Sequence, residues 1–148
     1  MDFALRKATA TDIPYLLELR DITMRRYLEE TGSPTSQKAY LERIMLHFED
    51  ANIIEVDGHS AGLFKATFLP ETQQWFVVQI QVHPDYQNHH IGSRLLRDLI
   101  NRAEQEQVAV TLGVLKSNPA RSLYERLGFR AVAETEFEYE MLLAAPLA

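Results

Sequence analysis

The sequence predicts an α/β protein, more narrowly an α+β arrangement in which helices pack on a mixed β-sheet. Segments with the hydrophobic period of strands and of helices follow each other in the order β-α-α-β-β-β-α-β-α-β-β. Asp57-Gly58, between two apolar runs, is the two-residue signal for a β-hairpin. A strand–helix–strand succession over residues 75–115 favours a right-handed crossover between parallel strands.

The first third of the chain predicts one strand and two helices. Residues 3–9 (FALRKAT) alternate weakly between apolar and polar side chains, as a strand does. Thr11-Asp12 then offers a helix N-cap, and a helical period of apolar residues continues until Thr31-Gly32 ends it. A second helix is expected to place its apolar face along residues 40–48.

The middle of the chain predicts three strands. NIIEV (52–56) and HSAGLFKATF (59–68) flank the Asp57-Gly58 turn and form the hairpin. LPETQQ (69–74) is a second turn, and WFVVQIQV (75–82) is the third of these strands.

The last third predicts the remaining helices and strands. Apolar residues recur with helical spacing over residues 91–106, and a nearly continuous apolar strand follows over residues 108–115. A short helix is expected over residues 118–128, where Asn118-Pro119 begins it and Gly128 ends it. RAVAET (130–135) and FEYEMLL (137–143) are the closing strands.

Composition limits the class of protein. At 148 residues the chain has the length of one domain, residues 1–148. Its net charge of −6 argues against a nucleic-acid partner, and no apolar run approaches the roughly 20 residues that a membrane helix needs. The start lacks the apolar core of a signal peptide, so a cytoplasmic location is expected. The absence of cysteine excludes disulfides, thiolate metal sites and a cysteine nucleophile, and no metal site is expected.

The ligand site is expected at the carboxyl end of the third middle strand, because ligands of such sheets bind where a strand gives way to a helix. Backbone N–H groups over residues 87–93 lack helical partners there, and with the helix dipole they suit a phosphate. Gly92 allows close approach of a ligand because it has no Cβ. Local cationic or donor side chains are His89, His90, Arg94 and Arg97. A polar surface turn with a glycine near a helix start would give the same pattern.

Two motifs carry a resemblance to a known family. IQVHPDYQNHHIGSRLL resembles the acetyl-coenzyme A binding motif of the GNAT superfamily of N-acetyltransferases, which runs Val-x-Pro-x-Tyr and then Gln/Arg-x-x-Gly-x-Gly/Ala. NPARSLYERLGFR resembles the second motif of the same family, with its Asn, its Leu-Tyr pair and its Leu-Gly-Phe. The element order also matches, so the resemblance covers nearly the whole chain and implies the GNAT-like acyl-CoA N-acyltransferase fold.

The resemblance implies an acetyl-CoA-dependent enzyme that acetylates a primary amine by direct attack. The backbone of Ile80 and Val82 would bind the acetyl carbonyl and the pantetheine amides, since the neighbouring strand diverges there. Asn118 would reach the pantetheine arm, and Tyr124 would be the general acid beside the sulfur. The residues implied in binding the pyrophosphate are Gln87, Asn88, His89, His90, Ile91, Gly92 and Ser93.

Chemistry supports the role implied for Tyr124. A tyrosine hydroxyl of pKa about 10 stays protonated at neutral pH and can donate to a thiolate whose parent pKa is about 8.5. An oriented backbone N–H can stabilise the developing oxyanion. A core aromatic on a short helix is the structural alternative for this residue.

The chain departs from the family pattern at two points. His90 replaces the first glycine of the turn, at a cost of about 1 kcal/mol if that position needs a positive φ. This puts coenzyme A affinity in doubt. Some family members carry a glutamate on the strand at 75–82, which has none here; Gln79 and Gln81 could hold a water there but could not accept a proton. His83 is interpreted as structural or solvent-facing.

The acceptor stays open between a small amine, an amino acid and a protein amine. Acidic residues near the implied crevice would attract a cationic amine, although a solvated face explains them better; they are Glu29, Glu30, Glu42, Glu134, Glu136, Glu138 and Glu140. The alternatives to an enzyme are a non-catalytic acyl-CoA binding or interaction module and a bare protein-binding scaffold. A homodimer formed through exposed strands also stays open.

Overall fold

The computed structural model describes residues 1–146, so residues 147 and 148 of the expected domain lie outside the described residues. The strands are β1 (Ala4–Lys7), β2 (Ala51–Val56), β3 (His59–Leu69), β4 (Gln74–Val82), β5 (Ala109–Leu115), β6 (Arg130–Glu134) and β7 (Glu138–Leu143). The α-helices are α1 (Ile13–Thr31), α2 (Gln37–Met45), α3 (Ile91–Glu106) and α4 (Ala120–Arg126). Short 3-10 turns are η1 (Ala10–Asp12), η2 (Phe48–Asp50) and η3 (Pro84–Tyr86).

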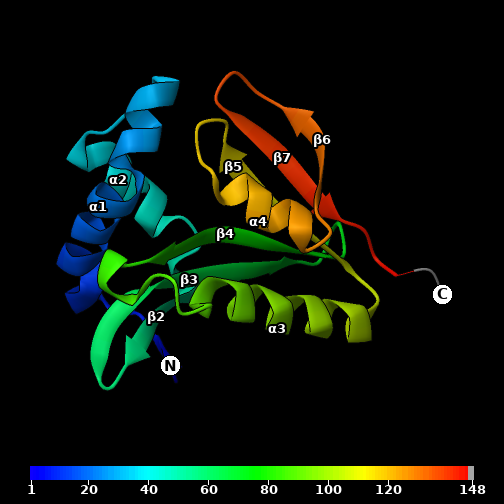
Figure 1. Ribbon diagram of the computed structural model, residues 1–148, viewed down its shortest axis with the longest axis horizontal. Helices are drawn as coiled ribbons and strands as arrows, with labels where there is room; N and C mark the ends of the chain where they lie inside the picture. Colours follow the sequence, from blue (N-terminus) through cyan, green and yellow to red (C-terminus); the bar gives the residue numbers. More distant parts are fainter. Residues whose placement is uncertain (147–148) are drawn as a thin grey trace.

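The strands form one sheet in the order β1-β2-β3-β4-β5-β7-β6 (Figure 1). Neighbouring strands are antiparallel except for β4 and β5, which are parallel and joined through α3. The predicted mixed sheet and the predicted order of strands and helices are therefore confirmed.

The β2–β3 hairpin turns at Asp57 and Gly58, as the sequence predicts. Both residues have positive φ angles, 51° and 77°. A two-residue turn with this backbone matches the right-handed twist of the strands it joins, which explains the Asp-Gly pair.

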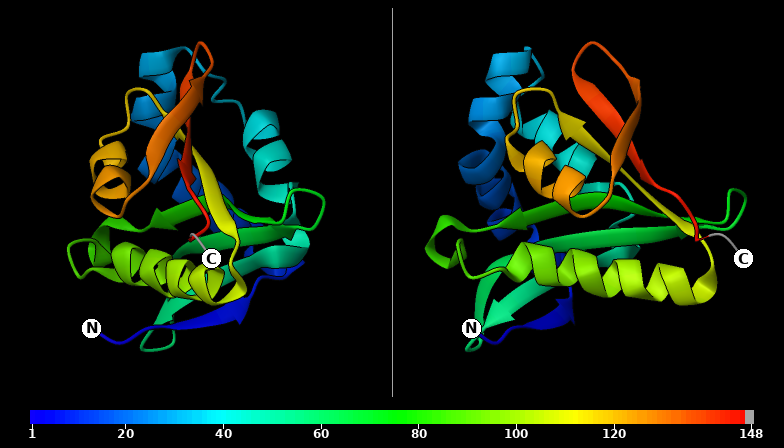
Figure 2. Two further views of the ribbon diagram at one scale, coloured as in Figure 1. Left: turned by 90° about the vertical axis from the view of Figure 1, so that its right-hand side faces the viewer. Right: turned by 45° about the vertical axis from the view of Figure 1, so that its right-hand side comes forward.

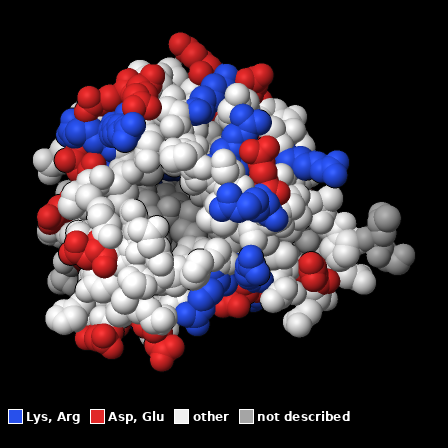
Figure 3. All heavy atoms as spheres, in the orientation of Figure 1, with Lys and Arg blue, Asp and Glu red and all other residues white. Residues whose placement is uncertain are grey.

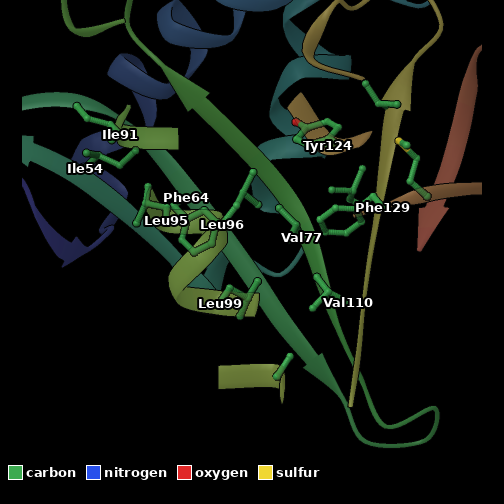
Figure 4. Packing of buried hydrophobic residues seen from close by; sticks show 14 of the residues in the cluster. Ile54, Phe64, Val77, Ile91, Leu95, Leu96, Leu99, Val110, Tyr124 and Phe129 are labelled. Atoms are coloured by element: carbon green, nitrogen blue, oxygen red, sulfur yellow. The ribbon is translucent and has the colours of Figure 1, made fainter. Parts of the chain in front are cut away.

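Helices cover both faces of the sheet. Amphipathic α3 and the short α4 lie on one face, and α1 and α2 lie on the other (Figure 2). On the first face, Leu95, Leu96 and Leu99 of α3 point toward Phe64 and Val77 of the sheet (Figure 4). A smaller apolar cluster on the second face joins α1 and α2 to β2 and β3. No helix within residues 1–146 combines the length and the apolar character that crossing a bilayer requires.

The end of α2 differs from the expected one. The helix ends at Met45, whereas the apolar period continues to Phe48. The side chain of Lys65 in β3 is fully buried, and its Nζ donates to three carbonyl oxygens at this helix end: Arg43 (3.2 Å), Ile44 (2.7 Å) and Leu46 (2.6 Å). Carbonyls in the last helical turn have no partner within the helix, so a lysine from a distant strand fixes where α2 stops.

The first strand is also shorter than the predicted residues 3–9. It covers Ala4–Lys7, and the chain then bends into η1. The Asp12 carboxylate accepts a hydrogen bond from the Thr9 backbone N–H at 2.8 Å and an ion pair from Arg6 at 2.9 Å, which stabilises the bend.

The feature that positions the site is the divergence of β4 and β5. Their pairing runs from Gln74–Ala109 to Val77–Leu112 and then stops, although both strands continue. The register of β3 against β4 shifts at the same place, so that Val78 has no partner in β3. This bulge bends β4 away from β5 and opens the sheet along one edge of β4.

Candidate active site

A cavity lies where β4 and β5 separate. It is lined by residues 77–81 of β4 and 112–115 of β5, together with Asn118 and Tyr124, and Arg20 of α1 and Arg43 of α2 close it from the other side. Its volume is about 110 Å³, whereas a neighbouring cavity of about 470 Å³ continues from Arg20 and Arg43 toward the loop between β6 and β7. Figure 3 shows the hollow between the N-terminal helices and the β5–α4 side of the molecule. The arrangement is a narrow chamber with a wider approach.

The edge of β4 beside this chamber carries backbone groups without a strand partner. The carbonyl of Val82 accepts a hydrogen bond from Gln87 Nε2 at 2.9 Å, whereas the next residue, His83, donates its N–H to Ala61 on the β3 side. Backbone groups two residues apart along a strand point to the same edge. The N–H groups of Ile80 and Val82 therefore point to the open edge, as the sequence interpretation requires.

The turn between η3 and α3 presents a series of backbone donors. Asn88 and His90 adopt left-handed conformations, with φ of 66° and 62°. Within residues 1–146, the first N–H after the turn that donates to a backbone carbonyl is that of Arg94, which bonds His90. The N–H groups of residues 88–93 thus stay available at the start of a 16-residue helix, where the dipole favours an anion.

The residues of this turn differ in the space and the hydrogen-bond donors that they leave for a ligand. A Cβ built on Gly92 would meet only Ile80 Cδ1, at 3.9 Å, so the space above the helix start is open. The N–H of Gln87 already donates to Pro84 and its side chain to Val82, so Gln87 shapes the turn and has few donors left for a ligand. His90, which stands where the family pattern has glycine, has a positive φ, so the condition for a conformational cost at this position is met.

Tyr124 and Asn118 come from the β5–α4 connection. Tyr124 is 7% exposed, its ring packs edge-on against Phe129 at 6.1 Å between centroids, and its hydroxyl end points toward β4 (Figure 4). Burial raises the pKa of Tyr124 to about 12, so the phenol is protonated at neutral pH. Asn118 Oδ1 accepts the N–H of Ala120 at 2.9 Å, which holds the side chain at the start of α4 and at the rim of the chamber.

Gln79 and Gln81 lie on the opposite side of β4 from the apolar core. They are 5% and 6% exposed, and they pair in register with Lys65 and Leu63, which face α1 and α2. Both amide atoms of Gln79 and the Oε1 of Gln81 are buried without a hydrogen-bond partner among the described residues. Buried polar atoms normally have partners, so these amides are available to a water or a ligand in the chamber.

Two cationic side chains of the chamber were not predicted. Arg20 and Arg43 were missed because their residue type suggests solvent exposure. A signal was present: Arg20 shares an i, i+4 row with Leu16, Met24 and Leu28, which is the stripe that α1 turns inward.

Only some of the acidic residues expected near the crevice line the chamber. Glu29 is exposed and pairs with Arg25 at 3.4 Å, and it is absent from the chamber lining. Glu138 of β7 does line the chamber, and its carboxylate oxygens lie 3.2 Å from the point where a Cβ on Gly113 would be. His83 accepts the N–H of Asp85 on Nδ1 at 3.1 Å, which agrees with the structural role inferred for it.

These groups form a recognisable chemical arrangement. An open strand edge and a protonated phenol meet at one chamber, which buried amides and guanidinium groups also line. The start of α3, with its free donors, lies beside the same strand, because Gly92 is next to Ile80. Such an arrangement can hold an extended ligand that has a phosphate at one end and a reacting carbonyl at the other.

Sequence comparison finds relatives of this chain among acetyltransferases. An amino-acid acetyltransferase of Actinobacillus pleuropneumoniae is 32% identical over 122 residues, which is 82% of this chain and 26% of that protein. The chain thus spans about a quarter of the length of the curated relatives that it matches.

Solved structures show the same fold. The PaiA N-acetyltransferase of Thermoplasma acidophilum, solved in complex with coenzyme A, has a TM-score of 0.74 at 16% identity and covers 97% of this chain and 99% of its own. A ribosomal-protein alanine N-acetyltransferase from Escherichia coli has a TM-score of 0.70 at 22% identity and covers 99% and 96%. The sequence model of the acetyltransferase (GNAT) family matches residues 16–129, which include most of α1, the divergent strands and Tyr124. Since that match extends over most of the chain, the protein belongs to the GNAT acetyltransferase family.

Proposed function

We propose that this protein is an N-acetyltransferase that moves the acetyl group of acetyl-CoA directly to a primary amine. The observation that carries the proposal is the meeting of the unpaired β4 edge at Ile80 with the phenol of Tyr124 in one chamber. A strand edge binds an extended chain of amides, and a buried phenol donates a proton; aminolysis of a thioester needs both.

The residues present fit coenzyme A. Donors from the backbone of residues 88–93 suit its diphosphate, and Gly92 leaves the space above them open. The free N–H groups of Ile80 and Val82 suit the pantetheine amides and the acetyl carbonyl, and the amide of Asn118 lies across from them at the rim of the chamber. When bound, acetyl-CoA supplies the activated acetyl group.

Groups of the protein then stabilise the charge that develops on the acetyl oxygen and protonate the departing sulfur. A backbone N–H on the β4 edge donates to the acetyl oxygen as negative charge develops there, an effect worth about 3–4 kcal/mol in other enzymes. The amine nitrogen bonds to the acetyl carbon, the carbon–sulfur bond breaks, and Tyr124 gives its proton to the departing sulfur. The proton released by the amine leaves through water and restores the phenol.

The acceptor must reach the chamber as a neutral amine. Only about one alkyl amine in a thousand is neutral at pH 7.4 when its pKa is about 10.4. No Asp or Glu occurs between Trp75 and Val82, and the buried amides of Gln79 and Gln81 can hold water that carries the proton away. The name of the curated relative makes an amino acid a candidate acceptor.

Substitution of Tyr124 tests the proposal. Tyr124→Phe removes the proton donor and keeps the ring, so we expect kcat to fall about 100-fold or more, with the KM for acetyl-CoA within about twofold of the wild type. Thiol release measured against an amine panel gives both constants. Tyr139→Phe, the same change on a strand outside the chamber, is the matched control. Undiminished turnover in Tyr124→Phe would remove Tyr124 from the mechanism.

A non-catalytic acyl-CoA binding module is the second candidate function. His90 in place of glycine and the strand without a carboxylate favour it. Calorimetry would then show tight acetyl-CoA binding while no amine in the panel releases thiol. An interaction scaffold without coenzyme A binding would show no rise in melting temperature with acetyl-CoA.

A further inference from the structure

We propose that the amine acceptor carries a carboxylate, which Arg20 and Arg43 bind at the α-helical side of the chamber, so that the substrate is a small zwitterion of amino-acid type. This inference rests on the proposed acetyl transfer and specifies its acceptor. The evidence for it is the arrangement of the side chains that line the chamber on the side of α1 and α2.

The two arginines stand where an acceptor must pass. Both line the narrow chamber that contains Tyr124, and both also line the wider cavity that leads to it. They come from different helices, α1 and α2, and so they close on the same space from two directions. A group held between them lies next to the reacting end of the chamber.

Neither arginine has an anionic partner. Within residues 1–146, no carboxylate oxygen lies within 4 Å of Arg20, Arg43 or the nearby Lys65. By contrast, Arg6, Arg25, Arg26, Arg102 and Arg121 all pair with a carboxylate. Withdrawing a cation from water without an anionic partner is unfavourable. Among the described residues, the Lys and Arg side chains that are not exposed and have no carboxylate partner are Arg20, Arg43 and Lys65, all near this site.

The lowered pKa values of Arg20, Arg43 and Lys65 show that burial, together with repulsion from neighbouring arginines at Arg20 and Lys65, disfavours their charged forms. Burial, and then the proximity of Arg43, lowers the pKa of Arg20 to about 10. Burial also lowers the pKa of Arg43, which Glu138 partly opposes. Burial and the charges of both arginines lower the pKa of Lys65 to about 8. A bound anion would relieve this mutual repulsion, whereas a second cation would add to it.

Donors remain free on the arginines but not on the lysine. All three protons of Lys65 Nζ are used by the end of α2, so Lys65 fixes the helix and takes no ligand. Arg43 gives one bond to the Val78 carbonyl at 2.9 Å, which holds its guanidinium at the bulge. The Nε of Arg20 is buried without a partner among the described residues, and its guanidinium lies over the Tyr40 ring at 5.5 Å. Planar donors held in this way suit a carboxylate.

A carboxylate that lines the same chamber suits the amine of the same molecule. The carboxylate of Glu138 lies over Gly113, where no side chain separates it from the chamber, and it lines both cavities with the arginines. Buried amide atoms of Gln79 and Gln81 face the same space without partners. Two cationic side chains and a carboxylate that line the same small chamber fit a zwitterion better than a polyamine or a lysine of a protein.

A matched panel tests this specificity. Thiol release from acetyl-CoA is measured with each of the twenty L-amino acids, with the carboxamide of each, and with a tripeptide amide that has a free N-terminal amine. We expect at least one amino acid to exceed its own carboxamide by 30-fold or more in kcat/KM, mainly through KM. The ratio of kcat/KM for the amino acid to kcat/KM for its carboxamide should fall toward one in Arg20→Gln and in Arg43→Gln. It should stay at the wild-type value in Arg26→Gln, an exposed arginine of α1 that pairs with Glu30.

Binding provides a second readout that does not need turnover. Calorimetric titration of the preferred amino acid into the coenzyme A complex should show binding that Arg20→Gln weakens 30-fold or more while the melting temperature of the variant shows that it is folded. Carboxamides or tripeptide amides acetylated as well as the free amino acids would overturn this inference and leave acetyl transfer intact. Absence of thiol release with every amine would overturn the proposed function, and the titration with the twenty amino acids would still decide whether the arginines bind a carboxylate.

Discussion

Tyr124 shows how a single side chain can be both a core residue and a proton donor. Its ring belongs to the main apolar cluster, which also includes Phe129 and Met141, while its hydroxyl lines the chamber. Burial in that cluster raises the phenol pKa to about 12. The structural and the proposed functional interpretations of Tyr124 therefore describe two ends of the same side chain, and its packing extends the pH range over which the phenol is protonated.

This pKa sets the expected pH dependence of the reaction. The acceptor amine must be neutral, so log kcat/KM for an alkyl amine should rise by about one per pH unit until the amine pKa of about 10.4. A phenol with its ordinary pKa of 10 would begin to lose its proton in the same range, but with a pKa near 12 Tyr124 stays protonated. A pH series between 6.5 and 9.5 should therefore show a rising limb alone. A falling limb within that range would mean that the acid has a much lower pKa than this phenol.

At the scale of elements, α2 depends on one lysine of β3. Lys65 satisfies three carbonyls at the end of the helix, and α2 in turn carries Arg43, which donates to the bulge of β4. The lysine, the helix end and the bulge thus form a chain of contacts from the sheet to the chamber wall. The position of Arg43 at the chamber therefore depends on where α2 ends.

Replacing this lysine should destabilise the fold. Lys65→Met leaves the carbonyls of the helix end without their donor, and we expect the free energy of unfolding at pH 7 to fall by about 2 kcal/mol, or the Tm by about 6 °C. Lys7→Met, at an exposed position of β1, should change the Tm little. Denaturant and thermal melts measure both variants.

The difference in stability between the wild type and Lys65→Met should increase with pH. Folding lowers the pKa of Lys65 from its ordinary value of 10.5 to about 8, so between these pH values the unfolded chain binds more protons than the folded one. The contribution of Lys65 to stability therefore increases from pH 8 toward pH 10.5. The wild type should exceed Lys65→Met by more at pH 9.5 than at pH 7, and a smaller difference at pH 9.5 would contradict the lowered pKa.

For the whole molecule, the sequence predicts the architecture well because strands and helices differ in hydrophobic period along this chain. The two motifs also place Tyr124 and the turn at residues 88–93 correctly on α4 and at the start of α3. The boundary of α2 was missed because a residue of β3 sets it, and no local pattern contains that contact. Arg20 and Arg43 were missed because arginine usually faces solvent, although Arg20 belongs to the inward row of α1. Glu29, one of the acidic residues expected near the crevice, is turned outward by α1.

A crystal structure of the protein with coenzyme A tests the central claim most directly, since that claim concerns where the donors of two distant segments converge. We expect the diphosphate within hydrogen-bond distance of N–H groups from residues 88–93, the pantetheine along β4 at Ile80 and Val82, and the sulfur beside the hydroxyl of Tyr124. Coenzyme A bound away from the divergent strands, or a sulfur that does not reach Tyr124, would contradict it.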